Sequence, residues 1–278
     1  MTHHNRRSAT GASSAMTLDR AAPTVAAPSP MVTATILVGG ESDAVAANPL
    51  TGSVYVANQL DNTVSVISGQ TNTVTATISA GSPQGMAVNP LTGDVYVTNF
   101  NDGTVSVISG GTNAVTATIP AGSLPISVAV NPLTGDVYVT NFNDGTVSVI
   151  SSRPNAVTAT ILVGTSPTGV AVCPLTGDVY VTNFNDGTVS VISSRTNTVT
   201  ATIPVGTSPT GVAVSPLTGD VYVTNIKTGT VSMISSGTNT VTATIPVGNG
   251  PAGVAVNPLT GDVYVTSIGD DIVWVISG

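Results

Sequence analysis

Charged residues are scarce in this chain. Only 7% of the 278 residues are Asp, Glu, Lys or Arg, against roughly 25% in ordinary globular proteins. Three of the 6 basic residues and one of the 14 acidic residues lie before residue 31, so residues 31–278 hold 13 acidic and 3 basic side chains, a net charge of −10. A surface with this charge repels phosphate backbones, and we expect no nucleic-acid partner.

Cysteine and histidine are nearly absent. The single cysteine, Cys173, excludes an intrachain disulfide framework. Both histidines, His3 and His4, lie in the first few residues. The rest of the chain therefore has no Ser-His-Asp triad and no histidine metal site. A glycine-rich phosphate loop between a strand and a helix is also missing.

Long apolar runs are absent as well. No stretch approaches 18 apolar residues, so we expect no transmembrane helix. Residues 1–30 are rich in Ala, Ser, Thr and Pro, which predicts a disordered N-terminal tail. Arg6 and Arg7 suggest a twin-arginine export signal, but no apolar segment follows them. The default expectation is a cytoplasmic protein.

The chain instead contains a regular repeat. The sequence Pro-Leu-Thr-Gly occurs six times, and successive prolines are 41, 42, 42, 42 and 42 residues apart; they are Pro49, Pro90, Pro132, Pro174, Pro216 and Pro258. A fixed period of this length indicates a repeat architecture.

Each repeat predicts four short strands and no helix. In the repeat at residues 207–248 the strands are expected at residues 211–215, 220–225, 230–235 and 240–245. We call them a, b, c and d. Pro-Leu-Thr-Gly forms the a–b turn, and Asn-Asp-Gly forms the b–c turn in three repeats. Four antiparallel strands in about 42 residues are typical of a propeller blade. The sequence thus predicts an all-β, six-bladed β-propeller over residues 31–278.

The order of the strands predicts how the ring closes. The first d strand, residues 32–37, precedes any a strand, and the last repeat ends just after its c strand. The N-terminal strand is therefore expected to complete the C-terminal blade, a 3+1 closure that removes open sheet edges. Trp274, the only tryptophan, lies in this last blade. It either packs at the closure or offers a platform for a ligand.

The b strands resemble the YVTN β-propeller repeat family. Tyr-Val-Thr-Asn begins at Tyr96, Tyr138, Tyr180 and Tyr222, with variants at Tyr55 and Tyr264. The resemblance covers residues 31–278. It implies a binding or scaffold module of the kind found in archaeal surface-layer and bacterial exported proteins. Related propellers include lactonases and a streptogramin lyase, whose histidines or metal-binding acidic residues have no match here.

Departures from the repeat mark candidate site residues on the face of the d–a and b–c loops. Five carboxylates are expected in one sector of that face: Glu41, Asp43, Asp61, Asp270 and Asp271. Three interpretations remain open. The carboxylates form a solvated rim; or Glu41, Asp43, Asp270 and Asp271 bind Ca²⁺ or Mg²⁺. In the third, Glu41, Asp43, Asp61 and Asp270 act as general acids and bases. Apart from such a divalent cation, no cofactor is expected.

The three phenylalanines, Phe100, Phe142 and Phe184, all follow the last Asn of a b strand. They either pack beneath the b–c turn or form an apolar crescent for a hydrophobic ligand or partner. Gln84 is the counterpart of Asp43 at the channel mouth and joins them as a ligand-binding candidate.

Two functions follow from these patterns. The first is a monomeric binding or scaffold module that presents one ring face to a protein or small-molecule ligand. The second is a lyase, cyclase or isomerase that uses the carboxylates over the central channel. Only the second requires those carboxylates to converge.

Overall fold

The structure, a computed structural model, describes residues 32–277. The chain divides into two units, residues 1–35 and 36–278. The predicted disordered tail, residues 1–30, lies outside the described residues. Apart from residues 32–35, everything described below belongs to the second unit.

The described part of this unit consists of strands and turns, and none of its residues forms a helix that could span a membrane. Its 23 strands form six sheets, each an antiparallel meander in chain order. The first sheet contains β1 (Ser42–Ala47), β2 (Ser53–Asn58), β3 (Thr63–Ser68) and β4 (Thr73–Ser79). The second contains β5 (Pro83–Val88), β6 (Val95–Asn99), β7 (Thr104–Ile108) and β8 (Val115–Pro120). The third contains β9 (Pro125–Val130), β10 (Val137–Asn141), β11 (Thr146–Ser151) and β12 (Ala156–Leu162).

The remaining three sheets repeat the same plan. The fourth contains β13 (Pro167–Val172), β14 (Val179–Asn183), β15 (Thr188–Ser193) and β16 (Thr198–Pro204). The fifth contains β17 (Pro209–Val214), β18 (Val221–Asn225), β19 (Thr230–Ser235) and β20 (Thr240–Pro246). The sixth has only three strands, β21 (Pro251–Val256), β22 (Val263–Ser267) and β23 (Ile272–Ile276). The predicted all-β fold with six propeller blades is confirmed.

Local turn chemistry explains why each repeat forms a meander. The glycine of every a–b turn has a positive φ, for example 81° at Gly177, where a side chain would be strained. The c–d turns place Asn in the same left-handed region, as at Asn197, with a φ of 52°. Between these turns, alternating Val, Thr and Tyr side chains suit a pleated strand.

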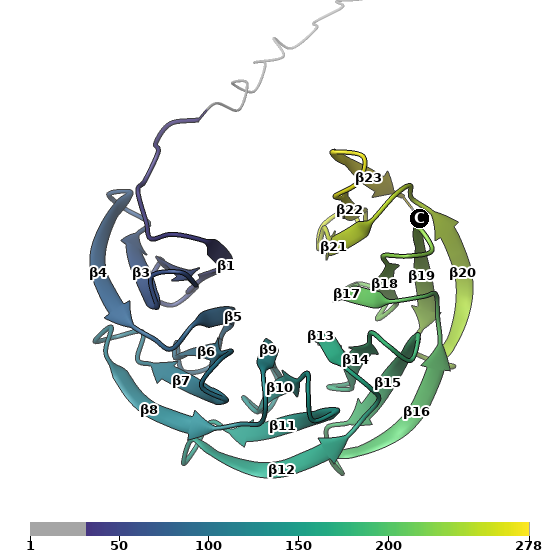
Figure 1. Cartoon of the computed structure of the whole chain (residues 1–278), viewed down its shortest axis with the longest axis horizontal. Helices are drawn as coiled ribbons and strands as arrows, with labels where there is room; N and C mark the ends of the chain where they lie inside the picture. Colours follow the sequence, from purple (N-terminus) through teal and green to yellow (C-terminus); the bar gives the residue numbers. More distant parts are fainter. Residues whose placement is uncertain (1–31, 278) are drawn as a thin grey trace, which may run out of the picture. The chain divides into compact units, whose positions relative to one another are not determined.

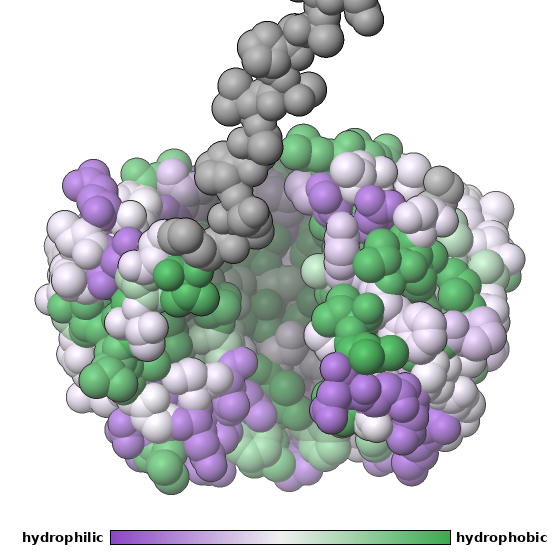
Figure 2. Space-filling view, turned by 90° about the horizontal axis from the view of Figure 1, so that it is seen from above, coloured by the Kyte–Doolittle hydropathy of each residue, from purple (hydrophilic) through white to green (hydrophobic). Residues whose placement is uncertain are grey.

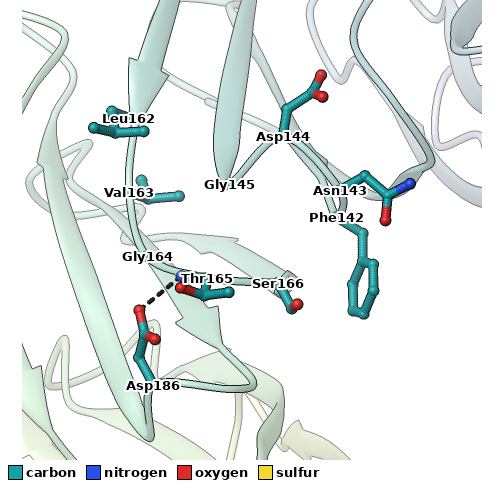
Figure 3. Close-up of a pocket in the computed structure, with 10 residues that line it drawn as sticks. All are labelled: Phe142, Asn143, Asp144, Gly145, Leu162, Val163, Gly164, Thr165, Ser166 and Asp186. Atoms are coloured by element: carbon teal, nitrogen blue, oxygen red, sulfur yellow. Dashed lines mark hydrogen bonds between the residues drawn. The ribbon is translucent and has the colours of Figure 1, made fainter.

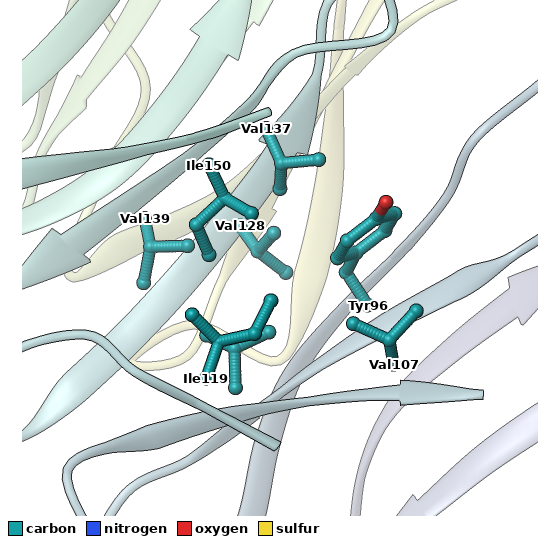
Figure 4. Close-up of a cluster of buried hydrophobic side chains, with 8 residues drawn as sticks. Tyr96, Val107, Ile119, Val128, Val137, Val139 and Ile150 are labelled. Carbon is teal, nitrogen blue, oxygen red and sulfur yellow. The ribbon is translucent and has the colours of Figure 1, made fainter. Parts of the chain in front are cut away.

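The core lies between neighbouring sheets. The six sheets follow one another around a common centre, with the a strands innermost and the d strands outermost (Figure 1). One buried cluster joins Tyr96 and Val107 of the second sheet to Val137 and Ile150 of the third (Figure 4). Equivalent clusters join the other successive sheets. Each sheet therefore depends on its neighbours for a buried face.

Hydrogen bonds also join each sheet to the next. The b-strand tyrosine donates to an Asn in the next sheet's c–d turn, as in Tyr96 Oη to Asn155 Oδ1 at 2.9 Å. The b-strand threonine donates to a carbonyl at the start of the next a strand, as in Thr98 Oγ1 to Ile126 O at 2.9 Å. The threonine bond recurs in three further sheets, and the tyrosine bond recurs in two, although the hydroxyl of Tyr138 has no partner among the described residues. The repeat therefore specifies inter-sheet contacts as well as strands.

The last sheet differs from the others. Tyr264 is 40% exposed, whereas its counterparts in the other five sheets are at most 8% exposed. The edge strand β23 exposes Ile272, Val273, Trp274 and Val275. Figure 2 shows hydrophobic residues, in green, on the side of the molecule where this sheet lies.

The d strand predicted at residues 32–37 is not formed: residues 32–39 have no regular secondary structure. The sixth sheet therefore lacks a fourth strand among the described residues. Closure of the ring stays a prediction.

Candidate functional site

The b–c turns and the d–a segments form one face of the unit, as predicted; we call it the b–c face. A carboxylate in the b–c turn holds the two together. Asp186 Oδ2 accepts a hydrogen bond from Thr165 N at 2.7 Å (Figure 3), and Asp144 Oδ2 accepts one from Ser123 N at 2.7 Å. Each bond joins residues 21 positions apart, about half a repeat. The packing of the strands therefore decides where these loops lie, more than the sequence of each loop does.

A groove separates the b–c turns of the third and fourth sheets. Its volume is about 370 Å³, and its walls include Phe142, Asp144, Val163, Thr165 and Asp186. Phe142 lies on the other side of this groove from Val163, with the backbone of the d–a segment between them (Figure 3). The groove therefore offers an aromatic ring, aliphatic groups and two carboxylates.

A second groove lies between the first and second sheets. Its volume is about 420 Å³, and Glu41, Gln59, Ser82, Phe100 and Asn101 are among the residues that line it. Glu41 thus contributes to a groove with Phe100, a combination that the sequence did not predict.

The three phenylalanines occupy equivalent positions on the b–c face. Each is half-buried, and each backbone N–H donates to a d–a carbonyl at 3.0 Å. Lys227 Nζ lies 6.0 Å from the centre of the Phe184 ring, within reach of a cation–π interaction. The backbone of each phenylalanine is therefore fixed by the d–a segment, and its side chain keeps part of its surface exposed.

Two of the five candidate carboxylates hold turns. Asp61 Oδ2 accepts from Gly40 N at 2.8 Å, and Asp270 Oδ2 accepts from Asn249 N at 2.6 Å and from Ser267 Oγ at 3.1 Å. These are the bonds that Asp144 and Asp186 make in other repeats. Asp61 and Asp270 therefore share a structural role that the spacing from the b strand could have revealed.

The other three candidates lie in the first and last sheets. Glu41 and Asp271 have positive φ angles of 49° and 56°, at turn positions that are left-handed in every repeat. Asp43 is an exposed residue at an irregularity of β1, between the paired residues Ser42 and Ala44. No group of three or more His, Cys, Asp or Glu residues suited to a metal ion occurs among the described residues. Convergence of Glu41 and Asp43 with Asp270 and Asp271 requires the ring closure.

Gln84 lies on β5, one of the a strands. Its side chain is half-buried, and its Oε1 atom is buried without a hydrogen-bond donor among the described residues. A buried acceptor without a donor is unusual in a folded protein, so Gln84 stays a ligand-binding candidate.

Burial raises the pKa of the b-strand tyrosines. The pKa of Tyr96 is raised to about 12 by burial and by the nearby charge of Asp94, and that of Tyr138 is raised to about 12 by burial and by Asp136. Burial also raises the pKa of Tyr180. The folded protein therefore favours the neutral phenol more than the unfolded chain does, since the ordinary value is 10.0.

These shifts predict a loss of stability at alkaline pH. Below pH 10 the tyrosines are neutral in both states, so they make no pH-dependent difference. Between about pH 10 and about pH 12 the unfolded chain ionises first, and the free energy of unfolding decreases. Denaturant unfolding across this range, with phenolate absorbance recorded in parallel, measures the effect. Tyr96→Phe should make the decrease shallower, and equal stability at both ends of the range would contradict the prediction.

One of three comparisons with known proteins supports the fold. No family model matches the chain, and no curated protein matches it. Among solved structures, hydrazine synthase of Kuenenia stuttgartiensis is similar, with a TM-score of 0.58 and 15% sequence identity. The match covers 90% of this chain and 99% of that chain. At this identity the similarity concerns the fold alone.

Proposed function

We propose that this β-propeller is a binding or scaffold module that presents its b–c face to a small-molecule ligand or a protein partner. The observation that carries the proposal is the set of half-buried phenylalanines, Phe100, Phe142 and Phe184, on successive b–c turns. A half-exposed aromatic ring at a repeated position beside a groove supplies contact area at little entropic cost.

The chemistry of the two grooves supports this proposal. Each combines one phenylalanine with hydroxyl, amide and carboxylate groups. Their volumes, about 370 and 420 Å³, fall within the range of about 300 to 1,000 Å³ found for ligand pockets. Because the two grooves differ in their side chains, a ligand can be selected by one pair of sheets.

The use of the carboxylates favours binding over catalysis. Asp61 and Asp270 are engaged by backbone N–H groups that hold the turns. A general acid or base needs a carboxyl group that faces the substrate. The proposal also includes a divalent cation, bound by Glu41, Asp43, Asp270 and Asp271. The screen described next tests such cations together with small metabolites. Membership of the YVTN family belongs to the same proposal and is supported by the repeated Tyr-Val-Thr-Asn sequence. A monomeric state is also part of the proposal.

A thermal-shift screen of the full chain against divalent cations and small metabolites tests this function. A ligand present at about 100 times its Kd is expected to add about 2.7 kcal/mol to the free energy of unfolding. Phe142→Ser should abolish the shift of a ligand bound in the groove of the third and fourth sheets. Ile268→Ser is the matched control, because Ile268 occupies the same turn position in the last repeat and is 65% exposed.

Three outcomes distinguish the alternatives. A shift lost in a phenylalanine variant and kept in the control supports binding at the b–c face. A Ca²⁺ or Mg²⁺ shift lost in Asp43→Asn places the function in the acidic sector instead. Chemical conversion of a compound that gives a shift would contradict the non-enzymatic proposal.

A further inference from the structure

The a–b turns expose one leucine from every repeat. The fractional exposure is 56–59% for Leu50, Leu91, Leu133, Leu175 and Leu217, and 88% for Leu259. Turn positions open to solvent are normally polar. Single exposed apolar side chains need no explanation, but six at equivalent points on one face form a patch.

These leucines adjoin an apolar cavity at the end of the central channel. The cavity has a volume of about 560 Å³, and its walls combine the ends of the a strands with the six prolines of the a–b turns. The valines among its lining residues are Val88, Val130, Val172, Val214 and Val256. We call the six leucines, six prolines and five valines the proline–leucine face.

Close contact between successive turns makes this face continuous. Every leucine except Leu259 lies against the glycine of the next sheet's turn: a Cβ atom built on Gly93 would be 3.4 Å from Leu50 Cδ1, and one on Gly135 would be 3.5 Å from Leu91 Cδ1. Asn48 Nδ2 also donates to Gly93 O at 2.7 Å, which fixes the spacing of the two turns. The first five turns are therefore in direct contact with the turns that follow them.

Carboxylates surround the proline–leucine face. Five repeats have Asp directly after the turn glycine: Asp94, Asp136, Asp178, Asp220 and Asp262. They are half-exposed, and some are oriented by the turn threonine, as in Thr134 Oγ1 to Asp136 Oδ2 at 3.0 Å. The basic residues near this end of the sheets are Arg153 and Arg195, in c–d turns. The apolar centre thus has a predominantly negative surround.

We infer that the proline–leucine face docks a polypeptide segment whose aliphatic side chains are flanked by lysine or arginine. The aliphatic side chains enter the cavity, and the basic side chains face the five aspartates. Complementary charge would steer such a partner to the face and exclude acidic ones. This site lies at the opposite end of the a strands from the b–c face, so it does not depend on the function proposed above.

Charge separates this partner from the other candidates. A second copy docked face to face would bring two sets of five aspartates together, an unfavourable arrangement of like charges. An anionic lipid surface is repelled in the same way. The near-identity of the six turns also means that the face recognises this chemistry rather than one particular sequence.

The experiment measures binding of the full-length protein to a synthetic amphipathic peptide made only of leucine and lysine. A second peptide, with glutamate in place of every lysine, is the charge control. We expect the lysine peptide to bind at least about tenfold more tightly at low salt, and the difference to shrink as salt is added.

Two pairs of variants locate the binding surface. Leu133→Ser with Leu175→Ser should weaken binding by about tenfold or more, because both residues belong to the proline–leucine face. Leu60→Ser with Leu162→Ser should leave it unchanged, since these leucines are 66% and 75% exposed elsewhere on the surface. For charge, Asp136→Asn with Asp178→Asn should weaken binding more than Glu41→Gln with Asp43→Asn.

Several results would overturn the inference. Equal binding of the two peptides would remove the role of charge. Unchanged affinity in the Leu133 and Leu175 variant, with an unchanged unfolding midpoint, would place the peptide elsewhere. Binding of neutral phosphatidylcholine vesicles in preference to the lysine peptide would assign the face to a lipid surface.

Discussion

A protein that lacks residues 1–39 should aggregate, whereas one that lacks residues 1–29 should remain soluble and unfold cooperatively. The longer deletion removes residues 32–37, the segment predicted to complete the sixth sheet. The sixth sheet then ends at β23, whose Val273 and Val275 are 57% and 54% exposed. An unpaired, hydrophobic edge strand is a template for pairing with other chains.

Size-exclusion chromatography and denaturant unfolding of the two deletions measure this effect. The shorter deletion controls for loss of the N-terminal tail, because it retains the predicted strand. A soluble monomer with a cooperative transition from the longer deletion would rule out closure by residues 32–37.

Tyr264→Ala should reduce stability as much as Tyr96→Ala, by about 3 to 5 kcal/mol. Tyr96 is fully buried and bonds to Asn155 of the next sheet. Tyr-to-Asn bonds of this kind join residues 58 or 59 positions apart. The c–d turn that follows the last sheet around a closed ring belongs to the first sheet, and its Asn is Asn72. Closure would therefore bury Tyr264 and bond it to Asn72.

The comparison of the two variants by chemical denaturation decides between an open and a closed ring. If the ring is open, Tyr264 keeps its 40% exposure, and Tyr264→Ala should then have a much smaller effect than Tyr96→Ala. A double-mutant cycle of Tyr264→Phe with Asn72→Ala adds a direct test, with an expected coupling of about 1 kcal/mol.

Much of each sheet could be predicted from local sequence. The c strand expected at residues 230–235 coincides with β19, and the d strand expected at 240–245 is one residue shorter than β20. The b strand was placed one residue early, because Asp220 closes the a–b turn by accepting a bond from Ser215 N at 2.8 Å. Alternation and turn residues act over a few positions, so they are visible in the sequence.

The candidate site was predicted less well. The sequence singled out Asp61 and Asp270 as unusual, yet their carboxylates do the same work as Asp144 and Asp186 in ordinary repeats. The exposure of the turn leucines was not predicted either. From sequence alone, a repeated leucine in a turn cannot be distinguished from a buried one until the positions of the sheets are known. Burial depends on neighbours that are distant in sequence, and local patterns do not reveal it.

The sequence by itself determined the six repeats, the all-β class, and the strands and turns within each repeat, because residues a few positions apart decide these features. Only the tertiary structure decided which polar groups join the sheets, as in the bond from Thr98 to Ile126 and the bond from Tyr96 to Asn155. It also decided that the turn leucines are exposed and that the turn prolines next to them line one cavity. The physical reason is that such partners are 28 to 59 residues apart and meet only when complete sheets pack face to face.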